Sequence, residues 1–243
     1  MKPFLFLGIR PEDDAAEEEY DAIRQFGGLR PEELERIRVE QAPILPIDLD
    51  DYSGIIVGGS PFNWSIPNSE KTELQQRVEN EFQILLGDIV KRDFPFLGIC
   101  YGIGALGTHQ GAKVDFEFGE TPGPILVSKT AAGQSDPILK GLPDEFYALT
   151  AHKEAISFLP ENASLLASSA HTPVQMFKVK NNVYATQFHP ELDIPGFVNR
   201  IRIYKNHGYF KPEELEATIK HVSSKPITHP AQIIGNFITR YAR

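Results

Sequence analysis

Short, uninterrupted apolar runs set the main limit on how this chain can fold. Residues 4–9, 54–59 and 94–99 are such runs, and each has the length of a strand that is buried on both faces. Residues 69–93 separate the last two runs and place apolar side chains at the steps of an amphipathic helix: Leu74, Val78, Phe82, Leu85 and Ile89. Strands that alternate with helices in this way predict a mostly parallel sheet with helices on both faces.

The remainder of the chain extends this pattern without a linker. Between Lys113 and Gln187, short runs separated by Gly, Pro and Asn indicate further strands of the same sheet: PILVS, FYALT, SLLASS, PVQMFKV and NVYATQF. Three helical patterns follow, roughly at 195–206, 212–222 and 229–241. We therefore expect one three-layer α/β/α domain over residues 1–243, in which residues 192–243 form a C-terminal helical extension.

Two charged segments are interpreted as solvated helix faces. Residues 12–21 carry a dense run of acidic side chains at the start of an expected helix. The stretch from Phe197 to Tyr209 is basic and helical, and Arg200 is among its charges. Charge runs on helices usually face water, so we expect both segments to form surface rather than site.

The charge balance and the single cysteine exclude several classes of protein. There are 24 Lys and Arg against 33 Asp and Glu, and a net charge of −9 repels a phosphate backbone, so nucleic acid is not an expected partner. No run approaches the roughly 20 apolar residues of a membrane helix, so no membrane contact is expected. One cysteine cannot form an internal disulfide, which favours a reducing, cytoplasmic location.

Cys100 stands where a strand is expected to meet a helix. In open parallel sheets, ligands bind at the carboxyl ends of the strands, so the residues that follow each strand are the first candidates. Residues 98–102 are Gly-Ile-Cys-Tyr-Gly, and flanking glycines permit the tight turn that lifts a nucleophile above a sheet. Backbone amides at a helix N-terminus also stabilise a thiolate. These features favour a nucleophile over a buried structural cysteine.

Two other strand ends indicate a base and an anion-binding turn. The expected strand over 183–188 ends at His189, and Glu191 lies two residues on, where it can reach and orient the imidazole. Residues 58–61 are Gly-Gly-Ser-Pro, and glycines after a buried strand leave backbone N–H groups open to a developing oxyanion. Either motif alone also suits an ordinary turn. Together with Cys100 they predict a catalytic triad.

The motifs GICYG, QFHPE and GGSP together resemble the class I, triad-type glutamine amidotransferases, in particular a stand-alone glutaminase similar to that of GMP synthetase. The resemblance covers nearly the whole chain. It implies a flavodoxin-like fold and hydrolysis of the glutamine side-chain amide through a cysteinyl thioester, which gives glutamate and ammonia. Cys100, His189 and Glu191 are the implied catalytic residues. The backbone N–H groups of Gly59 and Tyr101 are implied to hold the oxyanion.

The substrate contacts depart from the family pattern. The family elbow is usually followed by His-Gln, whereas this chain has Ile103 and Gly104. The expected substrate-binding residues come instead from the loop after the oxyanion glycines and from the AHKE stretch: Gly58, Ser60, Asn63, Trp64 and His152. The departure leaves open a hydrolase of another γ-glutamyl compound, such as an amine, peptide or folate. A non-catalytic binding or regulatory protein is a further alternative.

No cofactor or metal is expected. Gly102, Gly104 and Gly107 match the dinucleotide pattern G-x-G-x-x-G, but no acidic residue lies about 20 positions further on to bind a ribose. Close packing of a helix on the sheet explains these glycines better. The histidines show no metal-ligand spacing. No phosphate-binding loop of an ATP-dependent synthetase occurs in the sequence either, so the ammonia would serve a separate synthetase that associates with this chain.

Overall fold

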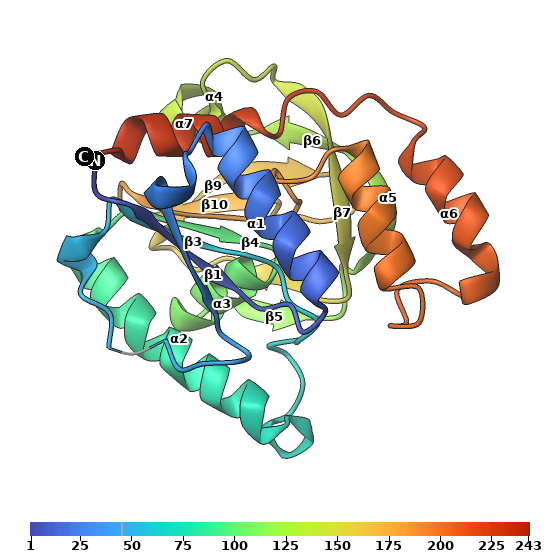
Figure 1. The fold of residues 1–243 in the computed structure, drawn as a ribbon. Coiled ribbons are helices and arrows are strands. Elements are labelled where there is room, and N and C mark those ends of the chain that lie inside the picture. The colour runs from blue at the N-terminus through green and yellow to red at the C-terminus, as the bar shows by residue number, and fades with distance from the viewer. Residues whose placement is uncertain (45) are drawn as a thin grey trace.

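One mixed sheet forms the centre of the protein, and helices cover both of its faces (Figure 1). The computed structural model describes residues 1–44 and 46–243. Within them, nine strands lie in the order β2-β1-β3-β4-β11-β10-β9-β6-β7. Their bounds are β1 Phe4–Gly8, β2 Leu34–Arg38, β3 Gly54–Val57, β4 Phe96–Ile99, β6 Glu120–Lys129, β7 Glu145–His152, β9 Ala163–Ser169, β10 Met176–Val179 and β11 Val183–Thr186. Strands β5 Lys113–Asp115 and β8 Ala155–Phe158 pair in a small separate sheet.

The alternation of side chains along β1 shows how the two helical layers are held. Phe4 and Phe6 pack in a core with α1 and α7, whereas Leu5 and Leu7 pack in a core with α2 and α3. The helices are α1 Asp13–Gly27, α2 Glu73–Arg92, α3 Tyr101–His109, α4 Ala131–Ser135, α5 Ile194–Ile203, α6 Leu215–Val222 and α7 Gln232–Tyr241. In the part of the chain that the structure describes, no helix combines the length and apolar character that crossing a bilayer requires.

The predicted α/β/α fold class is confirmed. Strands β2, β1, β3, β4 and β11 are parallel neighbours, while β10, β9, β6 and β7 continue the sheet in antiparallel pairs. All five runs predicted as strands between Lys113 and Gln187 lie on this sheet. The parallel half is therefore the part that resembles an open α/β sheet, and its carboxyl edge is where a site is expected.

Strand register brings the residues that follow several strands, most of the predicted site residues among them, to that edge. Leu7 pairs with Val57, Val57 with Gly98, and Gly98 with Ala185, so these residues form one row across β1, β3, β4 and β11. The chain continues from that row in the same direction in each strand because the strands are parallel. The segments that follow carry Arg10, the glycine pair after β3, Cys100 and His189 to one side of the sheet.

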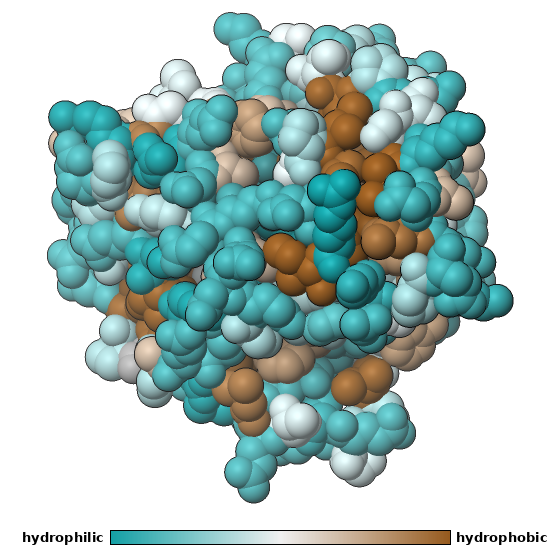
Figure 2. All heavy atoms as spheres, turned by 45° about the vertical axis from the view of Figure 1, so that its right-hand side comes forward, coloured by the Kyte–Doolittle hydropathy of each residue, from teal (hydrophilic) through white to brown (hydrophobic). Residues whose placement is uncertain are grey.

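Three helices occupy residues 192–243, where the sequence predicts them. Helix α5 packs beside α1 and α6, α6 contacts β6, and α7 lies along α1. Hydrophobic side chains break the mostly hydrophilic surface on the side that carries α5 and α6 (Figure 2). The expectation that α5 presents a solvated basic face is wrong at Arg200, which is 5% exposed and lies on the same buried face as Phe197.

The acidic run of α1 is likewise not all surface. Glu19 is fully buried, and its Oε1 accepts hydrogen bonds from Arg10 Nη2 at 2.9 Å and Arg200 Nη1 at 3.4 Å. The prediction that residues 12–21 face water is therefore wrong for Glu19. A carboxylate is kept charged in the interior only where cations and N–H donors surround it, and the two arginines fill that role.

We predict that Glu19→Ala destabilises the protein far more than Glu17→Ala. Removing Glu19 leaves two buried guanidinium groups without their carboxylate, which costs about 3–5 kcal/mol in the free energy of unfolding. Glu17 pairs with Arg36 at the surface and is mostly exposed, so its loss costs less than about 1 kcal/mol. Urea unfolding of the three proteins measures both values. Equal effects of the two substitutions would contradict the role given to Glu19.

Candidate active site

The turn at Cys100 is a strained connection between β4 and α3. Cys100 has φ 53° and ψ −92°, a left-handed backbone conformation that residues other than glycine seldom adopt. Gly98 and Gly102 pack directly on one another, because a Cβ atom on Gly98 would lie 2.7 Å from the Gly102 carbonyl carbon. The two glycines therefore let the chain reverse closely enough to raise Cys100 above the sheet, and the thiol is free.

His189 and Glu191 form a short, buried pair beyond the end of β11. The Nδ1 atom of His189 lies 2.6 Å from Glu191 Oε1, and both side chains are almost fully buried. The backbone N–H of His189 donates to the carbonyl oxygen of Leu149 at 2.9 Å, which anchors this segment to β7. His189 and Cys100 line the same pocket. The structure thus brings together the three residues that the sequence predicts as a triad.

The charges around His189 favour its protonated form. Burial lowers the pKa of His189, but the negative charges of Glu191 and Cys100 and hydrogen bonds to both outweigh burial and raise the pKa to about 9 from 6.5. Burial acts to raise the pKa of Glu191, whereas His189 and Arg200 hold it below its ordinary value of 4.5. An imidazolium between a carboxylate and a thiol is the arrangement that activates a cysteine nucleophile.

The two glycines after β3 make room for the buried ion pair. A Cβ atom on Gly58 would lie 2.6 Å from Glu19 Oε2, and one on Gly59 would overlap the guanidinium of Arg10. The backbone N–H of Gly59 donates to Glu19 Oε1 at 3.2 Å. The expectation of an open N–H at Gly59 is therefore not met in this structure. Tyr101 begins α3, and N–H groups in the first turn of a helix have no acceptor within it.

A first pocket of about 20 Å³ has Cys100 in its lining. Ser60, Asn63 and His152, three of the residues predicted to bind substrate, lie in its wall. Both ring nitrogens of His152 are occupied, Nε2 by Glu120 Oε2 and Nδ1 by the carbonyl oxygen of Glu154, each at 2.9 Å. His152 therefore shapes the pocket wall through fixed hydrogen bonds.

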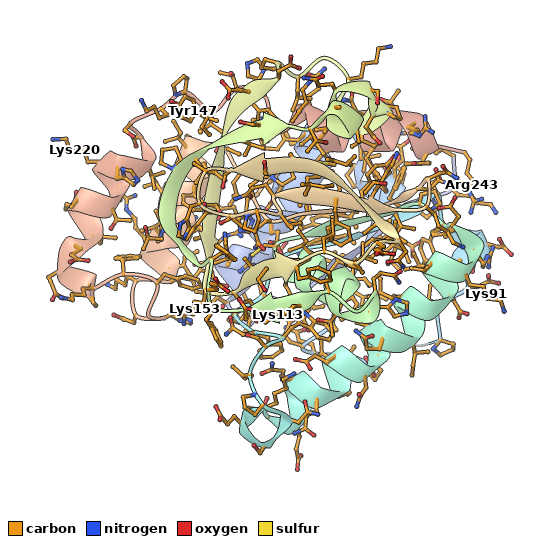
Figure 3. All side chains as sticks on the ribbon, turned by 180° about the vertical axis from the view of Figure 1, so that it is seen from behind. Lys91, Lys113, Tyr147, Lys153, Lys220 and Arg243 are labelled. Atoms are coloured by element: carbon orange, nitrogen blue, oxygen red, sulfur yellow. The ribbon has the colours of Figure 1, made fainter. Side chains whose placement is uncertain are left out.

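The rim of this pocket is closed by the chain that follows α5. Lys153 comes directly after β7 (Figure 3), and its Nζ donates to the carbonyl oxygen of His207 at 3.0 Å. The same ammonium group stands 5.0 Å from the centre of the Tyr209 ring. Tyr209 in turn lines the pocket beside Cys100. Residues of the C-terminal extension thus help to enclose the site.

Trp64 fills the space that a side chain at position 104 would need, where this chain has glycine in place of the glutamine usual in the family pattern. A Cβ atom on Gly104 would lie 2.8 Å from Trp64 Cδ1 and 3.5 Å from Glu154 Oε1. Trp64 is 7% exposed, and its ring centre stands 5.3 Å from that of Tyr101. It is not among the lining residues of the pocket, and neither is Gly58. The structure therefore places these two expected contact residues behind the pocket wall.

The loop that carries Trp64 is held by Glu154. The backbone N–H groups of Trp64 and Ser65 each donate to the Glu154 carboxylate at 2.8 Å, and the Ser65 hydroxyl donates to it at 2.6 Å. Burial raises the pKa of Glu154 despite these donors. In the sequence this glutamate stands out only as part of the AHKE stretch. Its carboxylate is the link between that stretch and the loop after β3.

A second pocket of about 40 Å³ also has Cys100 in its lining. Its lining includes Arg10, Arg200 and Tyr204, none of which was predicted as a site residue from the sequence. Arg10 could have been predicted from the sequence. It follows the first strand, and ligands bind at the carboxyl ends of parallel strands, which is the reason for which Cys100 was chosen. Arg200 and Tyr204 had none, since only the packing of α5 on α1 brings them to the sheet edge.

Comparison with known proteins places this site in a family context. A family model described as glutamine amidotransferase class-I matches residues 29–197. A glutamine-hydrolyzing GMP synthase subunit from Thermoplasma acidophilum is 34% identical over 155 residues, which make up 60% of this chain and 66% of that relative. The protein of the same name from Thermoplasma volcanium is 29% identical over 182 residues, 73% of this chain and 80% of that relative.

The fold is shared with solved structures as well. The crystal structure of a glutamine amidotransferase from Thermotoga maritima superposes with a TM-score of 0.73 and covers 99% of this chain and 98% of that one. The two sequences are 22% identical. At this identity the likeness establishes the α/β/α architecture, and the chemistry has to be inferred from the residues of the site.

We predict that His189 makes the stability of the protein depend on pH in a defined direction. Its pKa is higher in the folded state, about 9, than the ordinary 6.5 of an unfolded chain, so its contribution is complete below 6.5 and is lost as pH rises through 9. Between about pH 6 and pH 10 the wild type should lose up to about 3 kcal/mol more stability than His189→Gln.

Thermal melts of both proteins across this range measure the difference. His171→Gln, at an exposed position, is the control and should follow the wild type. If His189→Gln lost stability with rising pH as steeply as the wild type, the charged state assigned to His189 would be incorrect.

We also predict opposite effects of two glycine-to-alanine substitutions in helices. Gly104→Ala forces Trp64 to move, because the new Cβ would stand 2.8 Å from Cδ1, and costs about 1–3 kcal/mol. Among the described residues, the new Cβ in Gly87→Ala meets only His109, at 3.9 Å, and the substitution should stabilise the protein by about 0.5–1 kcal/mol through helix propensity. Melting temperature and the fluorescence of Trp64, the single tryptophan, report both. An unchanged emission spectrum in Gly104→Ala would refute the contact.

Proposed function

Because the chain belongs to the class-I glutamine amidotransferase family, we propose that it hydrolyses the side-chain amide of glutamine at Cys100. His189 acts as the acid and base, and Glu191 orients it. The products are glutamate and ammonia, and the ammonia passes to a separate synthetase. The observation that carries this proposal is the convergence of a strained cysteine turn and a buried His189–Glu191 pair on one pocket.

The reaction follows from the charges and positions of these groups. Imidazolium at His189 stabilises the Cys100 thiolate, which attacks the amide carbon of the substrate. His189 then gives its proton to the departing nitrogen, and a glutamyl thioester remains on Cys100. Water attacks the thioester after losing a proton to His189, and glutamate leaves. Glu191, 2.6 Å from His189 Nδ1, keeps the ring in one orientation through both steps.

The backbone N–H groups of Tyr101 and Gly59 are proposed to hold the oxyanion. They differ in their hydrogen bonding before the reaction. The N–H of Tyr101 lies at the start of α3, and N–H groups at a helix N-terminus favour a negative oxygen. The N–H of Gly59 is bonded to Glu19 at 3.2 Å. Glu19 would release this N–H when the negatively charged oxygen forms, because the arginine donors remain to hold the carboxylate. The oxyanion site is thus completed during the reaction.

The proposal of a synthetase partner rests on the relatives. Each of the two Thermoplasma proteins is named as one subunit of a glutamine-hydrolyzing GMP synthase, and that name implies a second polypeptide for the synthesis. By analogy, this chain would supply ammonia to an ATP-dependent synthetase on another polypeptide.

Addition of such a synthetase with its substrates should raise the rate of glutamine hydrolysis by this chain. An unchanged rate with every ammonia-dependent synthetase of the source organism would contradict the proposal of a synthetase partner.

We predict a steep loss of activity on removal of either end of the triad. Glutamate release from glutamine should fall at least about 1,000-fold in Cys100→Ser, and about 100-fold or more in Glu191→Gln, because the ring loses its orienting charge. Glu161→Gln changes a carboxylate in the exposed turn before β9 and should retain wild-type activity. A coupled glutamate assay on the purified chain measures all four proteins.

Two outcomes would overturn the proposal. Glutamate release that persists in Cys100→Ser would show that another group performs the chemistry. Failure of a glutamine-analogue electrophile to label Cys100, with and without a synthetase, would favour the alternative of a non-catalytic binding protein.

A further inference from the structure

Cys100 lies at the junction of two pockets. Ser60, Cys100, Ala151 and Tyr209 line both of them. The first pocket holds about 20 Å³ and the second about 40 Å³. Attack on an amide divides the substrate into an acyl part and an amine part on opposite sides of the attacked carbon. A nucleophile between two pockets is therefore arranged to place one part in each.

The position of His189 indicates which pocket takes the acyl part of the substrate and which takes the amine part. His189 lines the second pocket and is absent from the lining of the first. Because the acid must reach the nitrogen that departs, the amine side of the substrate lies on the His189 side. The first pocket is then left for the glutamyl group, and it presents polar side chains for a charged amino acid, among them Asn63, Glu154 and Gln187.

The second pocket is larger than ammonia requires, and its walls are mainly apolar. Leu192, Phe197, Ile201 and Phe210 contribute hydrocarbon surface. These side chains come from the C-terminal extension. Ammonia gains nothing from hydrocarbon walls, whereas an amine with an aliphatic or aromatic body does.

The same pocket is bordered by two buried guanidinium groups, those of Arg10 and Arg200, which pair with Glu19 and Glu18. Four N–H groups converge on one carboxylate oxygen, Glu19 Oε1: Arg10 Nε at 3.2 Å, Arg10 Nη2 at 2.9 Å, Gly59 N at 3.2 Å and Arg200 Nη1 at 3.4 Å. Arg200 Nη2 is buried and has no hydrogen-bond partner among the described residues. Its Nε lies 3.8 Å from Glu18, beyond hydrogen-bond range.

A buried guanidinium with an unpartnered N–H group is costly unless a ligand satisfies it. Arg200 is 5% exposed and lines the pocket, but Nη2 itself is covered, so a ligand in that pocket meets this N–H when the Arg200 side chain shifts toward it. Carboxylates match the geometry of guanidinium donors. The apolar walls and the unpartnered N–H together define a molecule with a hydrophobic body and a carboxylate.

We propose that the second pocket binds the leaving group of γ-glutamyl amides whose amine carries a carboxylate and an apolar side chain, with Arg200 as the residue that selects the carboxylate. This inference rests on the proposed function, since it requires Cys100 as nucleophile. It adds a further activity, the hydrolysis of γ-glutamyl amino acids, to the release of ammonia from glutamine.

The step balances without any further reactant. Cys100 thiolate bonds to the γ-carbonyl carbon, the carbon–nitrogen bond breaks, and the His189 proton goes to the nitrogen of the departing amino acid. Water then supplies a hydroxyl group to the glutamyl carbon and a proton to His189, and the thiolate is regenerated. One amide and one water give glutamate and one amino acid.

A matched substrate pair tests the assignment. γ-Glutamyl-leucine and γ-glutamyl-isopentylamine differ only in the carboxylate of the leaving group. We expect kcat/KM to be about 10-fold or more higher for γ-glutamyl-leucine, because a buried charge-assisted hydrogen bond is gained. In Arg200→Leu this ratio should fall to near one, and Arg200→Lys should restore part of it. Arg202→Leu, an exposed arginine on the same helix, should keep the wild-type ratio.

The ratio of the two kcat/KM values compares two substrates on the same protein. A general loss of activity or of folded protein lowers both values equally and leaves their ratio unchanged. If glutamine is hydrolysed in a Cys100-dependent manner but the ratio in the wild type is one or less, the inference is overturned and the proposed function stands. A high ratio that survives Arg200→Leu also overturns it. If neither glutamine nor any γ-glutamyl amide releases glutamate in a Cys100-dependent manner, the proposed function itself fails.

Discussion

Parallel pairing of β1, β3, β4 and β11 is the constraint on which the rest of the structure depends. The row formed by Leu7, Val57, Gly98 and Ala185 aligns four strands that are far apart in the sequence. Parallel strands need helical crossovers, so both faces of the sheet become buried and the strands become uniformly apolar. Every polar group that follows the row is then delivered to one edge, which is where Cys100 meets a base.

The buried carboxylate of Glu19 is the second organising feature. It draws Arg10 from the end of β1 and Arg200 from α5 to one point, and thereby ties the C-terminal helices to the sheet edge. The glycines that follow β3 are required by this cluster as much as by the chemistry, since any side chain there would meet Glu19 or Arg10. The same charges that stabilise the fold therefore set the electrostatics of the pocket beside Cys100.

The fold class and the convergence of Cys100, His189 and Glu191 were predictable because both follow from local rules. Apolar runs of strand length, a turn flanked by glycines and residues at strand ends act within a few positions of each other. The errors arose where a residue's surroundings come from distant segments. Glu19 sits in an acidic run that otherwise faces water, and Arg200 sits in a basic one. Charge patterning averages over such a run and misses the single position that turns inward.

Trp64 illustrates the same division within the site. The sequence showed that Ile103 and Gly104 replace the usual pair after the elbow, but it did not show that an indole from the loop after β3 fills the gap. By itself the sequence determined the strand order along the chain, the nucleophile turn and the charged residues available. Only the tertiary structure decided which charges are buried together and that Cys100 faces two pockets. Those properties depend on contacts between segments that no local pattern encodes.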